Sequence, residues 1–81
     1  MKEFEYKKEN IEEIKKSFEK DEEVIINFVE EWKVIYIHIN SSGEYEYDIY
    51  SMDTFDLDEP DYIEDGGCYD EIDWEDLKSL F

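Results

Sequence analysis

The fold is decided by residues 32–52, which read WKVIYIHINSSGEYEYDIYSM. In residues 32–39, isoleucines line one face, and Trp, Val, Tyr and His line the other. Residues 44–52 alternate in the same way, with Tyr, Tyr and Ile on one side and mainly acids on the other. Alternation with a period of two is typical of strands. Because residues 40–43 are turn formers, the stretch predicts an antiparallel hairpin.

The residues before this hairpin predict one more strand and a helix. Residues 24–29 are rich in β-branched side chains, and the two glutamates after them can turn the chain. Apolar side chains recur at helical spacing from Ile11 to Phe18, which predicts a helix over residues 8–20 that covers the isoleucine face. Asn10, with a glutamate three residues later, predicts a capping box at the start of this helix.

The chain after the hairpin is harder to assign, because neither period dominates residues 53–71. We expect a long acidic loop there, with a short edge strand or a helical turn as alternatives. The Asp-Gly-Gly sequence at residues 65–67 predicts a turn. Residues 72–81 predict a closing helix, whose apolar stripe contains Trp74, Leu77 and the final phenylalanine.

Together these elements predict an α+β fold, with an N-terminal helix packed on a three-stranded antiparallel sheet, an acidic loop and a short C-terminal helix. We expect a single domain over residues 1–81, since a chain of 81 residues has no room for a second core. Charged residues make up 42% of the chain, which alone would favour disorder, but 17% of the residues are aromatic. Disordered acidic segments are poor in aromatics, so the composition favours a folded domain.

The net charge of −18 is unevenly distributed along the chain. Residues 1–40 carry seven lysines against eleven acids, a net −4, whereas residues 41–81 carry one lysine against fifteen acids, a net −14. Nucleic-acid phosphates and anionic membranes both repel such a chain, so we expect no direct nucleic-acid partner and no membrane partner. The N-terminus has no apolar signal region and the single cysteine cannot form an internal disulfide, which predicts a cytoplasmic protein.

The sequence contains no arrangement typical of an enzyme. A catalytic triad needs a nucleophile, a base and an orienting acid, but the one histidine, His38, is expected to be a partly exposed strand residue. Acids around Cys68 disfavour a reactive thiolate, so we expect an ordinary loop residue there. The acids after residue 55 match no register of an EF-hand calcium loop. We therefore predict no enzyme activity, no cofactor and no dedicated metal site. We expect weak, nonspecific Ca²⁺ or Mg²⁺ association at this charge density.

One face of the second hairpin strand carries a row of acids. Glu44, Glu46 and Asp48 follow one another there at roughly 6.6 Å, a spacing similar to that of neighbouring phosphates on a DNA strand. Further acids continue this track, and interleaved tyrosines supply the apolar contacts that dominate protein–protein hot spots. We therefore predict a basic nucleic-acid-binding protein as the partner. The predicted partner-binding residues are Glu44, Glu46, Asp48, Tyr50, Asp53, Asp56, Asp58, Asp61, Tyr62, Glu64 and Asp65, with the two tyrosines as apolar anchors.

The acidic, aromatic-rich segment from Glu44 to Asp76, with the order helix, three strands and helix, resembles the small DNA-mimic inhibitors of phages and plasmids, above all the anti-CRISPR proteins. The resemblance covers the whole chain and depends on composition and element order, so it carries over no single residue. It implies an inhibitor, acting in a bacterial host cell, that occupies the DNA-binding or PAM-reading surface of a CRISPR effector nuclease such as Cas9. We expect a monomer or a dimer.

Other functions stay open at this point. An immunity protein or antitoxin would neutralise a basic nuclease toxin, and other DNA mimics inhibit restriction enzymes or DNA-repair enzymes. A run of acids is usually a solvated face, so a housekeeping acidic domain or a Ca²⁺-responsive module is a further alternative. The unequal charge of the two halves favours a binding surface, since solubility needs a net charge of only about 2–8 in magnitude.

Overall fold

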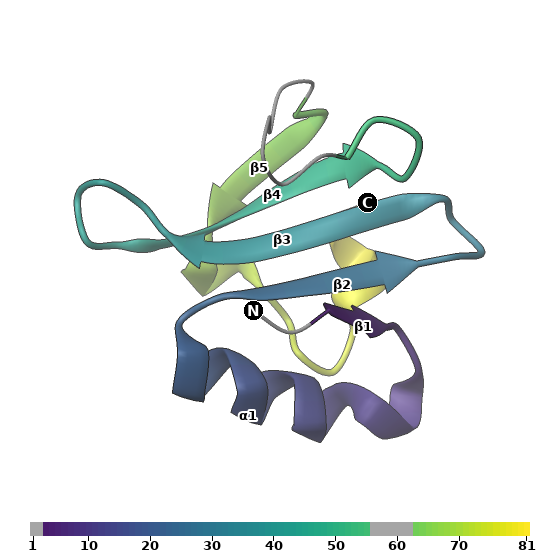
Figure 1. Ribbon diagram of the computed structural model, residues 1–81, viewed down its shortest axis with the longest axis horizontal. Coiled ribbons are helices and arrows are strands. Elements are labelled where there is room, and N and C mark those ends of the chain that lie inside the picture. The colour runs from purple at the N-terminus through teal and green to yellow at the C-terminus, as the bar shows by residue number, and fades with distance from the viewer. Residues whose placement is uncertain (1–2, 56–62) are drawn as a thin grey trace.

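The computed structural model describes residues 3–55 and 63–81. The described strands form one five-stranded sheet in the spatial order β1-β2-β3-β4-β5. β1 runs parallel to β2, and the other neighbouring pairs are antiparallel. Figure 1 shows α1 below the β1 edge of this sheet and the C-terminal segment, in yellow, behind the strands. The elements are β1 (Glu3–Glu5), α1 (Ile11–Asp21), β2 (Val24–Phe28), β3 (Lys33–Ile39), β4 (Tyr45–Ser51) and β5 (Asp65–Cys68).

The predicted antiparallel meander is confirmed as β2, β3 and β4. The prediction that these three strands form the whole sheet is wrong, because β1 pairs with β2 in parallel and β5 pairs with β4. In register, Ile35 of β3 stands opposite Ile26 of β2 and Ile49 of β4, and all three side chains are buried. This row lies on the side of the sheet that faces α1, so the isoleucine face is the core face, as predicted. Ile39 is an exception, because it lies at the end of β3 and is exposed.

The N-terminal helix is also confirmed, although it begins differently. A 3₁₀ turn over Lys8–Asn10 leads into α1, which buries Ile14 and Phe18 against the sheet. The predicted capping box is wrong, because Asn10 has φ −94° and ψ −4° and makes no side-chain cap hydrogen bond. A capping residue needs an extended backbone, whereas Asn10 continues the preceding turn.

The predicted C-terminal helix is wrong. The chain after β5 instead forms two 3₁₀ turns, Tyr69–Glu71 and Leu77–Leu80. Leu77 is fully buried, and Trp74 packs against the same core. A helix rises only ~1.5 Å per residue, so an irregular segment lets these side chains reach further across the sheet than a helix would. The described residues contain no helix long and apolar enough to cross a bilayer.

Residues 65–67, predicted as a turn, belong to β5. This strand pairs with β4, so the short edge strand left as an alternative for this region is confirmed. Close approach of the β4 backbone explains Gly66, because a Cβ there would lie 2.9 Å from the Tyr47 carbonyl oxygen. At Gly67 a Cβ would instead meet side-chain atoms, at 2.6 Å from Glu71 Oε2 and 2.7 Å from the Tyr47 hydroxyl oxygen. The glycines therefore make room for neighbouring atoms and do not mark a change of direction.

Buried side chains form two clusters on opposite faces of the sheet. The larger cluster lies between the sheet, α1 and the C-terminal segment, and it includes Ile14 and Leu77. The smaller cluster consists of Ile25, Val34 and Tyr50 on the other face. Both faces of the sheet therefore contribute to the core, and only part of the face turned away from α1 is left for a binding surface.

Candidate functional site

The face of the sheet turned away from α1 carries acids from several strands. In register, His38 of β3 stands opposite Glu46 of β4, and Tyr36 stands opposite Asp48. β1 stands beside β2 in a register that places its two glutamates on the same face as Ile25. We call this surface the acidic face. Its acids and its histidine are Glu3, Glu5, Glu23, Glu44, Glu46, Asp48 and His38.

Tyr36 contacts both His38 and Glu23 on the acidic face. Its ring stacks on the His38 ring, with centroids 4.5 Å apart, and its hydroxyl donates a 3.0 Å hydrogen bond to Glu23 Oε2. Burial, followed by this hydrogen bond, raises the pKa of Tyr36 to about 12. The phenol is therefore a neutral donor at physiological pH, and the contact with Glu23 fixes the ring that lies against His38.

His38, Glu46 and Asp48 form a close cluster on this face. His38 Nε2 lies 2.7 Å from Asp48 Oδ2 and 3.6 Å from Glu46 Oε1. One ligand atom of each side chain lies within 4.8 Å of the others, and all three residues are half-buried. Imidazole and carboxylate groups both coordinate divalent metal ions, so these three residues are the metal-binding candidate among the described residues.

The sequence interpretation missed this cluster. Alternation predicts which face His38 occupies, but it does not say which residue of the next strand stands opposite. That information lies in the register of the hairpin, which pairs Ile39 with Tyr45 across the turn. Counting outward from the turn at residues 40–43 places His38 opposite Glu46. The length of this turn was therefore the sequence signal that could have predicted the cluster.

The predicted acidic track does not form one continuous line. Glu46 and Asp48 share the acidic face as predicted, and Glu44 is exposed in the turn before β4. Asp65 instead stands opposite Ile49, whose side chain is in the larger core cluster, so the pairing with β5 divides the track between two faces. Four predicted residues lie outside the described part of the chain, namely Asp56, Asp58, Asp61 and Tyr62.

Two further predicted acids lie beyond the acidic face and contact other side chains. Glu64 forms an ion pair with Lys33, which stands opposite the buried Phe28 on the α1 side of the sheet. Asp53 follows the end of β4 and accepts a hydrogen bond from the Trp32 indole. Both acids are exposed, but neither continues the row of Glu46 and Asp48.

The predicted anchor Tyr50 is buried, and an exposed tryptophan was missed. Tyr50 is 1% exposed and belongs to the smaller core cluster, so its prediction as a surface anchor is wrong. Trp32 is 50% exposed, and its Nε1 donates a 2.6 Å hydrogen bond to Asp53 Oδ1. Its φ of 57° lies in the left-handed region, which bulky residues rarely adopt and which is often found at functional sites. The sequence placed Trp32 in a strand, but it lies in the turn before β3.

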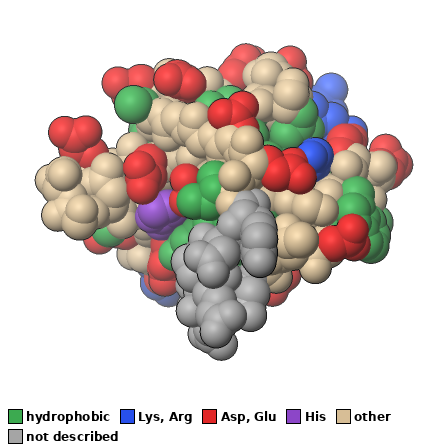
Figure 2. All heavy atoms as spheres, turned by 90° about the horizontal axis from the view of Figure 1, so that it is seen from above, with side chains coloured by type: hydrophobic (Ala, Val, Ile, Leu, Met, Phe, Trp, Pro, Cys, Tyr) green, Lys and Arg blue, Asp and Glu red, His purple; other side chains and the backbone are tan. Residues whose placement is uncertain are grey.

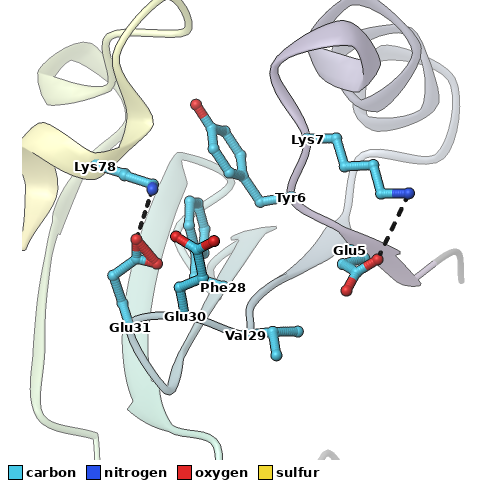
Figure 3. A pocket seen from close by; sticks show the side chains of 8 residues that line it. All are labelled: Glu5, Tyr6, Lys7, Phe28, Val29, Glu30, Glu31 and Lys78. Atoms are coloured by element: carbon cyan, nitrogen blue, oxygen red, sulfur yellow. Dashed lines mark ion pairs between the residues drawn. The ribbon is translucent and has the colours of Figure 1, made fainter.

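A pocket of about 300 Å³ opens between β1, the turn after β2 and the C-terminal segment (Figure 3). Its two lysines are each paired with an acid, since Lys78 Nζ lies 2.6 Å from Glu31 Oε1 and Lys7 Nζ lies 3.9 Å from Glu5 Oε2. The hydrogen bond to Glu31 raises the pKa of Lys78. The lining holds no histidine or cysteine that could act in catalysis. Its two lysines offset its acids, so the pocket is less suited to a basic partner than the acidic face is.

Known proteins provide no template for either surface. No protein-family model, no curated protein and no solved structure matches this chain. Function must therefore be inferred from the charges and contacts of the chain itself. Figure 2 looks onto the β5 edge of the sheet, where acidic side chains are spread over the surface and lysines are few.

The crowding of carboxylates predicts that salt stabilises the fold. At 10 mM salt the Debye length is about 30 Å, as long as the molecule, which measures 30 × 30 × 22 Å. Near 150 mM it is about 8 Å, so most of the repulsion within a net charge of −18 is screened. We expect the melting temperature followed by circular dichroism to rise by several degrees between these NaCl concentrations at pH 7. A constant or falling melting temperature would contradict the role of self-repulsion.

Proposed function

We propose that this chain is a DNA-mimic inhibitor, which binds the basic nucleic-acid-binding surface of a CRISPR effector nuclease and blocks DNA or PAM recognition. The observation that carries the proposal is the acidic face, where β1 and β4 each present two acids and no lysine lies among the described strand residues of that face. Arginines and lysines that hold phosphates bind carboxylates by the same charge-assisted hydrogen bonds.

The spacing of the acidic face supports this proposal. Along β4, Glu46 and Asp48 lie roughly 6.6 Å apart, and neighbouring strands lie about 4.8 Å apart. The acids of β1 and those of β4 are separated by β2 and β3, so the two groups lie roughly 14 Å apart across the face. This separation is similar to the ~12 Å major groove between two rows of phosphates. A basic cleft built for DNA would therefore meet two rows of negative charge.

The turn between β2 and β3 supplies an apolar contact for the partner. Trp32 and Val29 are both about half exposed, at 50% and 49%, and the Trp32 backbone N–H donates to the Val29 carbonyl oxygen. Tryptophan is enriched in interface hot spots. Because Asp53 already holds the indole by its Nε1 atom, this side chain loses little freedom when a partner packs on it.

Competition for DNA tests the proposal. A guide-loaded Cas9 is mixed with a fluorescent duplex that contains its target and PAM, and anisotropy is followed as the purified chain is added. We expect displacement of the duplex, with an apparent affinity that weakens as NaCl increases. Unchanged DNA binding at a large excess of the chain would exclude this target. The same assay with a restriction endonuclease and a DNA-repair glycosylase covers the other enzymes that DNA mimics inhibit, and failure with all three would contradict the mimic itself.

Charge reversal on the acidic face is expected to weaken this displacement. The change Glu3→Lys with Glu44→Lys places lysines at opposite margins of the face, on β1 and just before β4. The matched control, Glu12→Lys with Glu13→Lys, makes the same change in net charge on exposed positions of α1. We expect at least about a tenfold loss of apparent affinity for the first pair, equivalent to ~1.4 kcal/mol, and a much smaller loss for the control. Equal losses would mean that net charge alone drives binding.

An immunity protein or antitoxin is distinguished by the same assay. Such a protein can bind its nuclease outside the DNA site, so it forms a stable complex that leaves the duplex bound. Gel filtration of the three components would then show one peak containing nuclease, DNA and this chain. That result would replace the DNA-mimic proposal with inhibition at an exosite.

A further inference from the structure

We propose that His38, Glu46 and Asp48 form a binding site for a divalent transition-metal ion of the Zn²⁺ class. This site goes beyond the proposed inhibition and does not depend on it. The three side chains come from two neighbouring strands, β3 and β4, whose register places His38 opposite Glu46. A sheet is a rigid support, so the ligands are held in place before an ion binds.

The distances suit a small divalent ion. His38 Nε2 lies 2.7 Å from Asp48 Oδ2 and 3.6 Å from Glu46 Oε1, and the three ligand atoms lie within 4.8 Å of one another. Ligand atoms bound tetrahedrally to Zn²⁺ at about 2.1 Å are separated by about 3.4 Å. An ion at this site therefore requires the Asp48 carboxylate to move about 0.7 Å away from Nε2, whereas Glu46 Oε1 already lies near the required separation.

The second nitrogen of His38 provides an independent observation. Nδ1 lies 3.2 Å from the Ile39 carbonyl oxygen, which accepts a hydrogen bond in the tautomer that carries its hydrogen on Nδ1. In that tautomer Nε2 is free to bind an ion, and the ion takes the place of the hydrogen that Nε2 would otherwise donate to Asp48 Oδ2 at 2.7 Å. Metal-binding histidines are commonly oriented in this way, with one nitrogen donating to a carbonyl and the other facing the ion. The stacked Tyr36 ring, fixed by Glu23, holds the imidazole from one side.

The ligand set indicates which ion binds. An imidazole with two carboxylates suits zinc and its neighbours in the first transition row, whereas Ca²⁺ and Mg²⁺ prefer oxygen ligands alone. The His38 and Asp48 side chains are only 18% and 17% exposed, and Glu46 is 38% exposed. The site thus opens to solvent on the Glu46 side, and three protein ligands leave a fourth position for water or for a group of a partner.

Titration of the 81-residue chain tests the site. The protein is treated with EDTA, exchanged into metal-free buffer at pH 7.4 and titrated with ZnCl₂ in a calorimeter. We expect saturable binding of one ion per chain. The chain has one histidine, so its two ring proton signals in the NMR spectrum report on His38 alone, and we expect both to shift in step with the calorimetric titration. If neither signal moves when Zn²⁺ is saturating, the proposal is overturned whatever the variants do.

Variants assign the ligands. His38→Asn and the pair Glu46→Gln with Asp48→Asn should each weaken Zn²⁺ binding at least tenfold, while circular dichroism confirms the fold. The pair Glu12→Gln with Glu13→Gln removes the same charge from α1 and should leave the affinity within about twofold. Cys68→Ser is a second control, because Cys68 stands opposite Glu46 in β5 and is exposed. Full binding in His38→Asn, or loss of binding in Cys68→Ser, would overturn the assignment to these three ligands.

Discussion

Leu77→Ala is expected to lower the free energy of unfolding by about 2–5 kcal/mol, the range for removal of a fully buried leucine side chain. Leu77 is 0% exposed and packs in the same cluster as Ile14 of α1 and Ile35 of β3. Alanine at this position leaves a cavity between the sheet and the C-terminal segment. Since ~1 kcal/mol corresponds to about 4–8 °C in a domain of this size, the melting temperature should fall by roughly 10 °C or more.

Leu80→Ala is the matched control for this prediction. Leu80 belongs to the same 3₁₀ turn and loses the same atoms, but it is only partly buried. Urea unfolding followed by circular dichroism should therefore give a clearly smaller loss for Leu80→Ala. Equal losses in the two variants, or no loss in Leu77→Ala, would mean that Leu77 does not hold the C-terminal segment against the core.

The helix and the three central strands could be predicted because their signals are local. The alternation of residues 32–39 and the turn formers at residues 40–43 lie next to each other in the chain, and so do the apolar positions of α1. β1 could not be predicted in this way. Its three residues, Glu3–Glu5, are too few for a period, and their parallel pairing with β2 exists only once α1 has brought the chain back.

The C-terminal segment was mistaken for a helix because the spacing of its apolar residues fits both a helix and a non-helical segment that packs on the core. Trp74 and Leu77 are three residues apart, which places them on one face of a helix. In the structure both contact the core without an α-helix, Trp74 from a turn and Leu77 from the start of a 3₁₀ turn. The glycines of β5 misled for a related reason, since Gly66 and Gly67 allow close approach to Tyr47 but are also typical turn residues.

The acidic face could be predicted in part. Alternation correctly placed Glu46, Asp48 and Tyr50 on the same side of β4. It could not show that the chain after β4 folds back, where Phe55 donates its backbone N–H to the Ser51 carbonyl oxygen and packs its ring against Tyr50 at 4.9 Å. This tertiary contact turned a position predicted to be at the surface into a buried one.

Tyr50→Ala is expected to destabilise the fold by about 3–5 kcal/mol, as found for large aromatic side chains removed from a core. Tyr50 is 1% exposed, packs with Ile25 and Val34, and contacts Phe55 edge to face. Tyr50→Phe keeps the ring and its packing, so its cost should be far smaller. Thermal and urea unfolding of the two variants would measure this difference, and similar costs would mean that the hydroxyl, and not the ring, holds the smaller cluster.

Variants of Trp32 and Tyr50 distinguish a side chain that stabilises the core from one that binds the partner. Trp32 is half exposed, so Trp32→Ala should change the stability much less than Tyr50→Ala does. If Trp32 is an anchor for the partner, Trp32→Ala should weaken displacement of DNA from the nuclease at least about tenfold, since hot-spot tryptophans cost ~2 kcal/mol or more when truncated. Tyr50→Phe, which keeps both the fold and the acidic face, should displace DNA as well as the unchanged chain. The opposite pattern would be full displacement of DNA by Trp32→Ala and weak displacement by a folded Tyr50→Phe. That result would mean that Tyr50 is the anchor and that the smaller cluster opens when the partner binds.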